Sequence, residues 1–247
     1  MIKPLLIALQ FLTRLPVPDT GAVTDRQIGQ SLLYYPMVGL IIGGLLVLAA
    51  WITEGGPEGV RAALLLVIWT LITGFLHLDG LADSADAWAG GLGDREKTLA
   101  IMKDPSAGPA GVTVVLLVLL AKFAALEALL NQASYVALIL VPMLSRAMIP
   151  LLLLTTDYVR KNGLGSALAT HHPKRASLWV IFSCAIFTIF MAGSSGLWLL
   201  ITLTMLFLSL RRMMIQRIQG VTGDTLGATV ELSEAVGLMM LAVVVFY

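Results

Sequence analysis

The sequence predicts an all-α, polytopic integral membrane protein with about seven transmembrane helices and an N-terminal interfacial helix. Of its 247 residues, 58% are hydrophobic and only 13% are charged, whereas soluble domains carry about 45–50% apolar and about 25% charged residues. The apolar residues form runs of roughly 16–23, the length that crosses a ~30 Å hydrocarbon core at 1.5 Å per residue. Each run is expected to be a helix because a helix satisfies its own backbone where no water is available.

The N-terminal apolar stretch, Pro4–Leu12, is short and lacks a small-residue cleavage site. We interpret it as an uncleaved interfacial segment. Longer runs follow without an internal repeat or a low-complexity linker, so residues 1–247 are expected to form one domain. The predicted spans are Leu32–Thr53, Ala62–Leu78, Pro109–Leu130, Ser134–Thr156, Ala176–Gly193, Gly196–Leu210 and Leu226–Phe246.

The distribution of lysine and arginine predicts the orientation, because cytoplasmic loops are enriched in both. With the N-terminus inside and seven spans, thirteen of these residues are cytoplasmic, Arg61 alone is outside, and Tyr247 ends outside. Short connections at 131–133 and 194–195 further predict antiparallel hairpins. The thirteen are Lys3, Arg14, Arg26, Arg95, Lys97, Lys103, Arg160, Lys161, Lys174, Arg175, Arg211, Arg212 and Arg217.

The strongest candidate for chemistry is the stretch His77-Leu-Asp79-Gly80-Leu-Ala-Asp83-Ser-Ala-Asp86, at the cytoplasmic end of the second span. The three aspartates are spaced i, i+4, i+7 and would share one face of a helix. Such carboxylates repel one another unless a cation compensates them, and Mg²⁺ prefers oxygen ligands and bridges carboxylates to phosphates. The alternatives are a solvated acidic turn that caps the span and, for His77, an ordinary interfacial histidine.

The loop that follows carries a short amphipathic stretch and then a glycine-rich helix start. Leu99, Ala100 and Met102 lie between charged residues, which predicts a short helix on the membrane surface. Gly108 and Gly111 open the third span. A helix start of this kind can bind a phosphate on free backbone N–H groups, although every span must begin somehow.

Ionisable residues inside the spans are further candidates. Lys122 lies deep in the third span, Arg146 in the fourth, and Glu231 and Glu234 in the seventh. Each costs at least ~2.5 kcal/mol at the bilayer centre unless it is paired or faces water. They are either functional or internally paired, for example Lys122 with Glu127, or Arg146 with a glutamate of the seventh span.

Two prolines flank the arginine of the fourth span. Pro142 and Pro150 lie on either side of Arg146, and proline removes a helical hydrogen bond. We therefore expect a broken helix around a cavity.

The start of the seventh span carries a second acidic pattern. If the helix begins near Asp224, then Asp224, Glu231 and Glu234 share one stripe that could face the first carboxylate cluster. A compatible, simpler role for this start is an Asp or Thr N-cap.

Three other patterns have ordinary interpretations. The basic stretch His171–Arg175 obeys the positive-inside rule or binds phosphate. Gly39 and Gly43 form a small-xxx-small signal for helix packing. The single cysteine, Cys184, has no intrachain disulfide partner and is interpreted as a small hydrophobe.

Motifs spread over nearly the whole chain follow the order and spacing of one known family. On these residues the chain resembles the cobalamin synthase family, the adenosylcobinamide-GDP ribazoletransferases. One departure is Pro105, which follows Asp104 where serine is more usual. The motifs are Phe11-Leu-Thr-Arg14-Leu-Pro16-Val-Pro18, Tyr35-Pro36-Met-Val-Gly39, His77–Asp86, Met102-Lys103-Asp104 with Gly108, Leu120-Ala121-Lys122, Ser145-Arg146, and Gly223-Asp224-Thr225-Leu226-Gly227-Ala228 with Glu231.

The resemblance implies an Mg²⁺-dependent transferase in the bacterial cytoplasmic membrane, with its active site on the cytoplasmic side. Its implied substrates are adenosylcobinamide-GDP and α-ribazole or its 5′-phosphate, and its products are adenosylcobalamin (or the 5′-phosphate) and GMP. The implied partners are these substrates and the lipid bilayer, not nucleic acid, with a homo-oligomer left open.

The expected site residues combine the motifs with the resemblance. Metal ligands are expected among the three aspartates of the second-span motif, and phosphate contacts among basic residues and the second acidic stripe. The catalytic candidates are Asp79, Asp83, Asp104 and Arg146; the substrate- or phosphate-binding candidates are Arg14, His77, Lys122, Asp224 and Glu231; and the metal-ligand candidates are Asp79, Asp83 and Asp86.

Two other classes of membrane protein are weaker matches. A CDP-alcohol phosphotransferase needs Asp-Gly-x-x-Ala-Arg, but Asp79-Gly80 is followed by Leu-Ala-Asp-Ser. An ion-coupled transporter would use Lys122, Arg146 and Glu231 along a pathway and would need polar residues on both sides. The outside loops of this chain are almost bare of charge, which argues against it.

Overall fold

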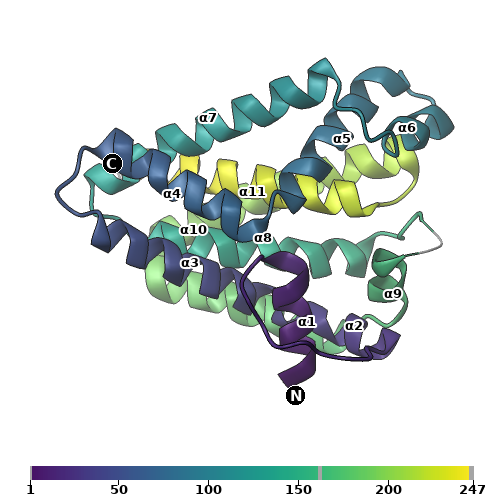
Figure 1. Ribbon diagram of the computed structural model, residues 1–247, viewed down its shortest axis with the longest axis horizontal. Coiled ribbons are helices and arrows are strands. Elements are labelled where there is room, and N and C mark those ends of the chain that lie inside the picture. The colour runs from purple at the N-terminus through teal and green to yellow at the C-terminus, as the bar shows by residue number, and fades with distance from the viewer. Residues whose placement is uncertain (1, 161–162, 245–247) are drawn as a thin grey trace.

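The computed structural model describes residues 2–160 and 163–244, which form a bundle of helices (Figure 1). Within this part of the chain no strand occurs beyond an isolated parallel bridge between Tyr158 and Val221. The all-α prediction is confirmed. The elements are α1 (Ile2–Leu12), α2 (Asp25–Ser31), the 3₁₀ turn η1 (Leu32–Tyr34), α3 (Tyr35–Ile52), α4 (Glu58–Thr73), α5 (Leu76–Gly91), α6 (Arg95–Ile101), α7 (Pro109–Asn131), α8 (Val136–Thr155), α9 (Leu164–Thr170), α10 (Lys174–Ile218) and α11 (Gly223–Val244).

The membrane character of the chain is evident from helix length and from exposed apolar side chains. By length and composition, the described residues contain five helices that can cross a membrane, or six if the bent pair α4–α5 is one span. The five are Asp25–Ile52, α7, α8, α10 and α11. Phe190 is 82% exposed and Met205 65% exposed, as expected for side chains that face lipid.

The 45-residue helix α10 reverses at Gly193. A straight helix of that length would extend about 68 Å, roughly twice the hydrocarbon thickness. Gly193 has non-helical angles (φ 53°, ψ −126°). A Cβ placed on Gly196 would lie 2.5 Å from the carbonyl oxygen of Thr188, whereas residues eight apart in a straight helix are about 12 Å apart. The two arms match the predicted hairpin of the fifth and sixth spans, and the count of seven crossings stays a prediction.

The end of the second predicted span is wrong. We expected one helix over Ala62–Leu78, but α4 ends at Thr73 and α5 starts at Leu76, bent by 89° from α4. Gly74 and Phe75 both have left-handed angles (φ 61° and 64°), which stop the helix. The aspartate motif therefore lies on a helix of its own, α5, at one end of the bundle (Figure 1).

The fourth span is a continuous helix, so the expected break is also wrong. Pro142 and Pro150 lie inside α8, which runs unbroken from Val136 to Thr155. The partner helix α3 approaches it at Gly39 and Gly43: a Cβ on Gly39 would lie 2.3 Å from the Pro142 carbonyl oxygen. The small-residue packing signal is thus confirmed, because only glycine lets the backbones come so close.

The N-terminal segment is helical, as expected. Its helix, α1, buries Ala8 and Leu12 completely and packs against α2 and α3. Its location at the membrane interface stays a prediction.

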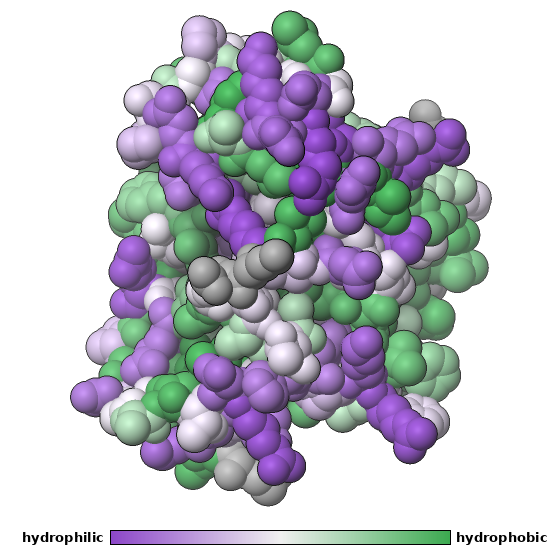
Figure 2. All heavy atoms as spheres, turned by 90° about the vertical axis from the view of Figure 1, so that its right-hand side faces the viewer, coloured by the Kyte–Doolittle hydropathy of each residue, from purple (hydrophilic) through white to green (hydrophobic). Residues whose placement is uncertain are grey.

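Arginines from α6, from the last turn of α10 and from the loop after α8 meet at the end of the bundle that carries α5 and α6. Arg95 donates to the Ile218 carbonyl at 3.0 Å, Arg217 to the Trp88 carbonyl at 2.6 Å, and Arg160 to Asp224. Figure 2 looks onto this end, where hydrophilic side chains gather on the surface. The helix α11 starts there and runs to the opposite end (Figure 1). Three predictions concern residues that are not among the described ones. The sequence predicts that Lys161 is cytoplasmic, that Phe246 ends the seventh span and that Tyr247 is on the opposite side of the membrane.

The orientation can be tested with fusions to the C-terminus. Thirteen lysines and arginines are assigned to the cytoplasm and one to the opposite side, which with seven spans leaves the C-terminus outside. We therefore expect a C-terminal alkaline phosphatase to be active and a C-terminal fluorescent protein to be dark. A fusion in the 103–107 loop should give the reverse pattern and serves as the control. The opposite result at the C-terminus would reject the seven-span count or the orientation.

Candidate active site

The site is built where α5 crosses the start of α11, and two glycines make the crossing possible. A Cβ on Gly80 of α5 would lie 2.7 Å from the Asp224 carbonyl oxygen, and a Cβ on Gly227 of α11 would lie 3.3 Å from the His77 Cα. Side chains at these positions would separate the helices. The close approach therefore brings the aspartate motif of α5 against Asp224.

The N-cap of α11 is Thr222. The simpler role expected for this segment, an Asp or Thr N-cap, is therefore confirmed. The Thr222 hydroxyl accepts from the Thr225 N–H at 3.3 Å, and the Thr225 hydroxyl accepts from the Thr222 N–H at 2.9 Å. Since these hydroxyls cap the helix, the carboxylate of Asp224 is available for other contacts.

Arg160 is the cation of the site, and the sequence analysis counted it only as a cytoplasmic charge. Its guanidinium donates to Asp224 Oδ2 at 2.5 Å and to the Met102 carbonyl at 3.3 Å. Backbone pairing of its loop with the loop before α11 positions it: Val159 N–H donates to the Val221 carbonyl at 2.8 Å. No periodic pattern marks a contact between two loops, so the sequence carried no signal for it.

Two carboxylates interact with this arginine, and a third lies beside them. Asp79 and Asp83 of α5 and Asp224 of α11 are close enough to repel one another, and Arg160 attracts both Asp83 and Asp224. Asp79 is exposed, whereas Asp83 and Asp224 are half-buried. Among residues 2–160 and 163–244, these three negative charges face the one positive charge of Arg160, so the cluster, which we call the acid cluster (Asp79, Asp83, Asp224), carries excess negative charge.

The third aspartate of the motif has a different partner. Asp86 accepts hydrogen bonds from the N–H groups of Gly108 and Gly111 at 2.7 and 2.8 Å, so it binds the start of α7. These two N–H groups are therefore not free to bind phosphate, which corrects the expectation for this helix start. The expectation that Asp86 is a metal ligand stays a prediction. Within residues 2–160 and 163–244, no three His, Cys, Asp or Glu side chains are arranged to hold a metal ion.

Asp104 lies outside the acid cluster, on the exposed loop between α6 and α7. The Ser106 N–H donates to its carboxylate at 2.9 Å, and this bond lowers the pKa of Asp104 below its ordinary value. The expected surface helix before this loop is present as α6, capped by Asp94. The Asp86 contact anchors the far end of the loop. No contact in the described part of the structure tests the catalytic role expected for Asp104, which stays a prediction.

A cavity of about 150 Å³ opens beside the acid cluster. Its polar lining consists of His77, Asp79, Asp224 and Tyr158, and Phe11 of α1 forms part of the wall. Burial raises the pKa of the Tyr158 phenol, which therefore stays protonated near neutral pH and can donate a hydrogen bond. Three expected site residues thus meet at one cavity.

The ionisable residues of the spans form a separate buried network. Lys122 Nζ lies 2.5 Å from Glu231 Oε2 and also contacts Glu234, which in turn pairs with Arg146. Ser145 Oγ accepts from Arg146 at 2.9 Å. All four charged side chains are buried, and two positive charges balance two negative ones. The network ties α7, α8 and α11 together.

This network corrects one of the two expected pairings and confirms the other. Lys122 pairs with the glutamates of α11, not with Glu127. Arg146 pairs with Glu234, which confirms the alternative that it pairs with a glutamate of the seventh span. Lys122, Arg146 and Glu231 do not line the cavity of the acid cluster. Their expected contacts with substrate phosphate therefore stay predictions.

Arg14 lies at the corner between α4 and α5. The backbone N–H of Arg14 donates to the Ile72 carbonyl at 2.7 Å. A Cβ on Gly74 would lie 2.3 Å from the Nε atom of the Arg14 side chain. The side chain is exposed and is not among the residues that line the cavity. Its expected contact with phosphate stays a prediction.

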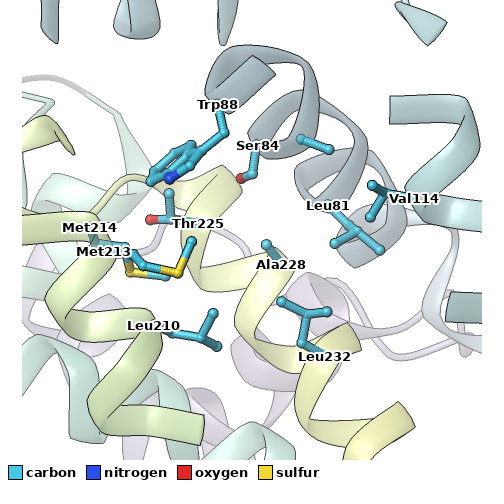
Figure 3. Close-up of a pocket in the computed structure, with 11 residues that line it drawn as sticks. Leu81, Ser84, Trp88, Val114, Leu210, Met213, Met214, Thr225, Ala228 and Leu232 are labelled. Atoms are coloured by element: carbon cyan, nitrogen blue, oxygen red, sulfur yellow. The ribbon is translucent and has the colours of Figure 1, made fainter. Parts of the chain in front are cut away.

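A second cavity of about 210 Å³ lies between α5, α7, α10 and α11 (Figure 3). Leu81, Trp88, Val114 and Leu232 point into it, and its accessible lining is apolar. Leu81 and Ser84 lie on the side of α5 opposite to Asp79 and Asp83. This apolar cavity is therefore distinct from the acid cluster.

Substitution of Gly80 should separate the two helices of the site. Gly80→Val is expected to displace α11 from α5 and to lose most activity, because the added atoms meet the Asp224 backbone. Gly44→Val is the control, since a Cβ on Gly44 has no neighbour within 4 Å. Enzyme activity and detergent melting of both variants provide the measurement, and a fully active Gly80→Val would contradict the crossing.

Comparison with known proteins assigns the chain to a family over nearly its whole length. The model of the cobalamin-5-phosphate synthase family matches residues 4–242. Proteins called adenosylcobinamide-GDP ribazoletransferase are similar in Pseudomonas entomophila (52% identity; 98% of this chain, 99% of the relative), Pseudomonas putida KT2440 (51%; 97% and 98%) and Pseudomonas aeruginosa PAO1 (52%; 98% and 98%). No solved structure matches. The chain therefore belongs to the cobalamin-5-phosphate synthase family.

Proposed function

We propose that the chain joins adenosylcobinamide-GDP to α-ribazole or α-ribazole 5′-phosphate and releases GMP. The ribose 3′-hydroxyl oxygen forms a bond to the phosphorus that carries cobinamide, and the bond from that phosphorus to the GMP oxygen breaks. The hydroxyl proton passes to a carboxylate of the acid cluster. The products are adenosylcobalamin or its 5′-phosphate and GMP.

The observation that supports this reaction best is the acid cluster beside a cavity. Phosphoryl transfer requires positioning and charge neutralisation more than covalent catalysis by the protein. The proposal is supported by the crossing of α5 and α11, which brings carboxylates next to Arg160. Carboxylates can accept a proton or bind a cation, and a guanidinium can donate to phosphate oxygens. The phenol of Tyr158 supplies a further donor at the same cavity.

The carboxylates of the acid cluster fit Mg²⁺, which prefers hard oxygen ligands and is often held by one or two carboxylates and substrate phosphates. We propose that Asp79 and Asp83 hold it, with Asp224 beside them. The excess negative charge of the cluster supports this assignment. A bound Mg²⁺ would neutralise the charge of the diphosphate. The chain's own groups orient the hydroxyl and accept its proton.

We further propose that the site lies on the cytoplasmic side of the inner membrane. The arginines that meet at the α5 end support this placement through the positive-inside rule. Both soluble substrates would then reach the cavity from the cytoplasm.

Metal removal tests the proposal. Wild-type protein in liposomes should stop releasing GMP in EDTA and recover when Mg²⁺ or Mn²⁺ is added in excess, whereas Ca²⁺ should restore less because its geometry is looser. GMP release that continues unchanged in EDTA would contradict the metal assignment. Omission of α-ribazole phosphate is the control for simple hydrolysis of the diphosphate.

A further inference from the structure

A groove of about 350 Å³ lies on the outside of the bundle, between α3 with the preceding η1 and the first arm of α10 (174–192). Both α3 and α10 pack against α8, and Met143 of α8, only 2% exposed, forms the floor. The walls are Leu33, Met37 and Leu40 on one side and Trp179, Ser183 and Phe187 on the other. Each wall therefore follows one helix face for about 12 Å, and the accessible lining is almost entirely apolar.

The groove opens between two helices that can cross a membrane, Asp25–Ile52 and α10. Trp179 is 70% exposed and Met37 48% exposed, so both rims present large apolar side chains to the surroundings of the bundle. Exposed tryptophans near the ends of spans are typical of the membrane interface. The groove thus leads from the interface, at Trp179, along the hydrocarbon-facing part of the two helices.

Two cations lie at the interface end of the groove. Lys174 and Arg175 are the first residues of α10, and both are exposed. Arg175 precedes Trp179 by four residues and so lies on the same face of the helix. None of the ion pairs in the described part of the chain involves either cation. Cations in the first turn are unfavourable to the helix dipole, so an anion bound there would stabilise them.

The corner that carries these cations is held by contacts on both sides. A Cβ on Gly29 of α2 would collide with the His171 carbonyl, so the two backbones touch. The His172 Nε2 lies 2.8 Å from the Ser177 hydroxyl oxygen, which ties the corner to the first turn of α10. Figure 1 shows α2 and α9 at the end of the bundle that also carries α5 and α6. The cations are therefore presented from a fixed frame at that end.

We propose that this groove binds one acyl chain of an anionic phospholipid, and that Lys174 and Arg175 hold the phosphate of its headgroup. An acyl chain is long, narrow and apolar, as the groove is. Ammonium and guanidinium groups both donate charge-assisted hydrogen bonds to phosphate oxygens, and basic pockets between membrane helices bind anionic headgroups. A zwitterionic lipid brings a cation of its own toward the same two charges, so the site favours a headgroup with net negative charge. The inference does not depend on the proposed function.

Lipid titrations tests the charged end of the site without any substrate. Purified protein in detergent is titrated with dioleoyl phosphatidylglycerol or dioleoyl phosphatidylcholine, and native mass spectrometry counts the bound lipid. Wild type should bind the phosphatidylglycerol at least about tenfold more tightly. The double substitution Lys174→Gln with Arg175→Gln should reduce this preference to less than about twofold. Equal affinity of wild type for the two lipids would overturn the proposal.

The matched control removes the same two kinds of charge elsewhere. Lys97→Gln with Arg212→Gln changes exposed side chains that do not line the groove, so the preference for phosphatidylglycerol should stay at the wild-type value. An equal loss in this control would show that net charge alone attracts the lipid, which also overturns the proposal. Detergent melting curves verify that all variants are folded.

Filling the groove tests its apolar part independently of the cations. Ser183→Trp places an indole in the groove and should weaken phosphatidylglycerol binding about tenfold. Ile186→Trp is the control, because Ile186 is exposed on the same arm but does not line the groove, and its binding should be unchanged. Unchanged binding by Ser183→Trp contradicts the proposal. A wild-type dimer that Ser183→Trp converts into a monomer would assign the groove to a second copy of the chain and overturn it.

Discussion

Asp79→Asn and Asp83→Asn should each lower GMP release by about 10²–10⁴-fold, the range that a positioned acid or base contributes. Both substitutions preserve shape and remove a charge from the acid cluster, which loses a proton acceptor or a cation ligand. Membrane insertion and detergent melting should stay near wild type, because neither carboxylate has a structural partner comparable to that of Asp86. The measurement is GMP release in liposomes with excess Mg²⁺.

The control for these variants removes a carboxylate from the same end of the bundle. Glu96→Gln changes an exposed side chain of α6 outside the cavity and should keep wild-type activity. Asp86→Asn should differ both from the two acid-cluster variants and from Glu96→Gln. It releases the start of α7 and so should lower the melting temperature as well as the activity. Full activity of Asp79→Asn and Asp83→Asn, alone or in EDTA, would show that the acid cluster has no catalytic role.

Glu234→Ala should cause the largest loss of stability, about 3–5 kcal/mol, because it leaves Arg146 and Lys122 short of a counter-charge in a buried site. For a chain of this length, that corresponds to a melting temperature lower by roughly 6–20 °C. Arg146→Lys keeps the charge and should be the mildest change at the other end of the pair. Detergent melting curves provide the measurement.

A double substitution separates charge balance from packing. Arg146→Met with Glu234→Met removes one charge of each sign and leaves Lys122 paired with Glu231, so it should be more stable than either single substitution. Glu127→Ala is the control, because Glu127 does not pair with the lysine of its own helix in the structure. Equal stability of Glu234→Ala and wild type would show that the network does not hold α7, α8 and α11 together.

The sequence was sufficient for features that depend on local periodicity. Apolar run length predicted the long helices, and the spacing of Asp79, Asp83 and Asp86 predicted one helix face, because both follow from helix geometry. The glycine pair of α3 predicted a close helix contact without naming its partner, α8. These inferences need no knowledge of which helices are neighbours.

Tertiary contacts accounted for the errors. Lys122 and Glu127 are five residues apart, which places them on different faces of one helix, so the real partners had to come from α11. Asp86 satisfies the start of a helix 22 residues away, which no spacing rule identifies. Phe75 adopts a left-handed conformation that glycine usually takes, so only Gly74 hinted that the second span would turn there. Arg160 depends on the pairing of two loops.

The most direct test of the account is the stoichiometry of the transfer. Purified protein in liposomes is incubated with adenosylcobinamide-GDP, α-ribazole 5′-phosphate and Mg²⁺, and GMP and corrinoid products are separated and quantified. We predict one GMP for each adenosylcobalamin 5′-phosphate formed, no GMP without the ribazole, and about 10²–10⁴-fold less of both products from Asp79→Asn. Release of GMP without α-ribazole phosphate, or equal turnover by Asp79→Asn, would contradict transfer at the acid cluster.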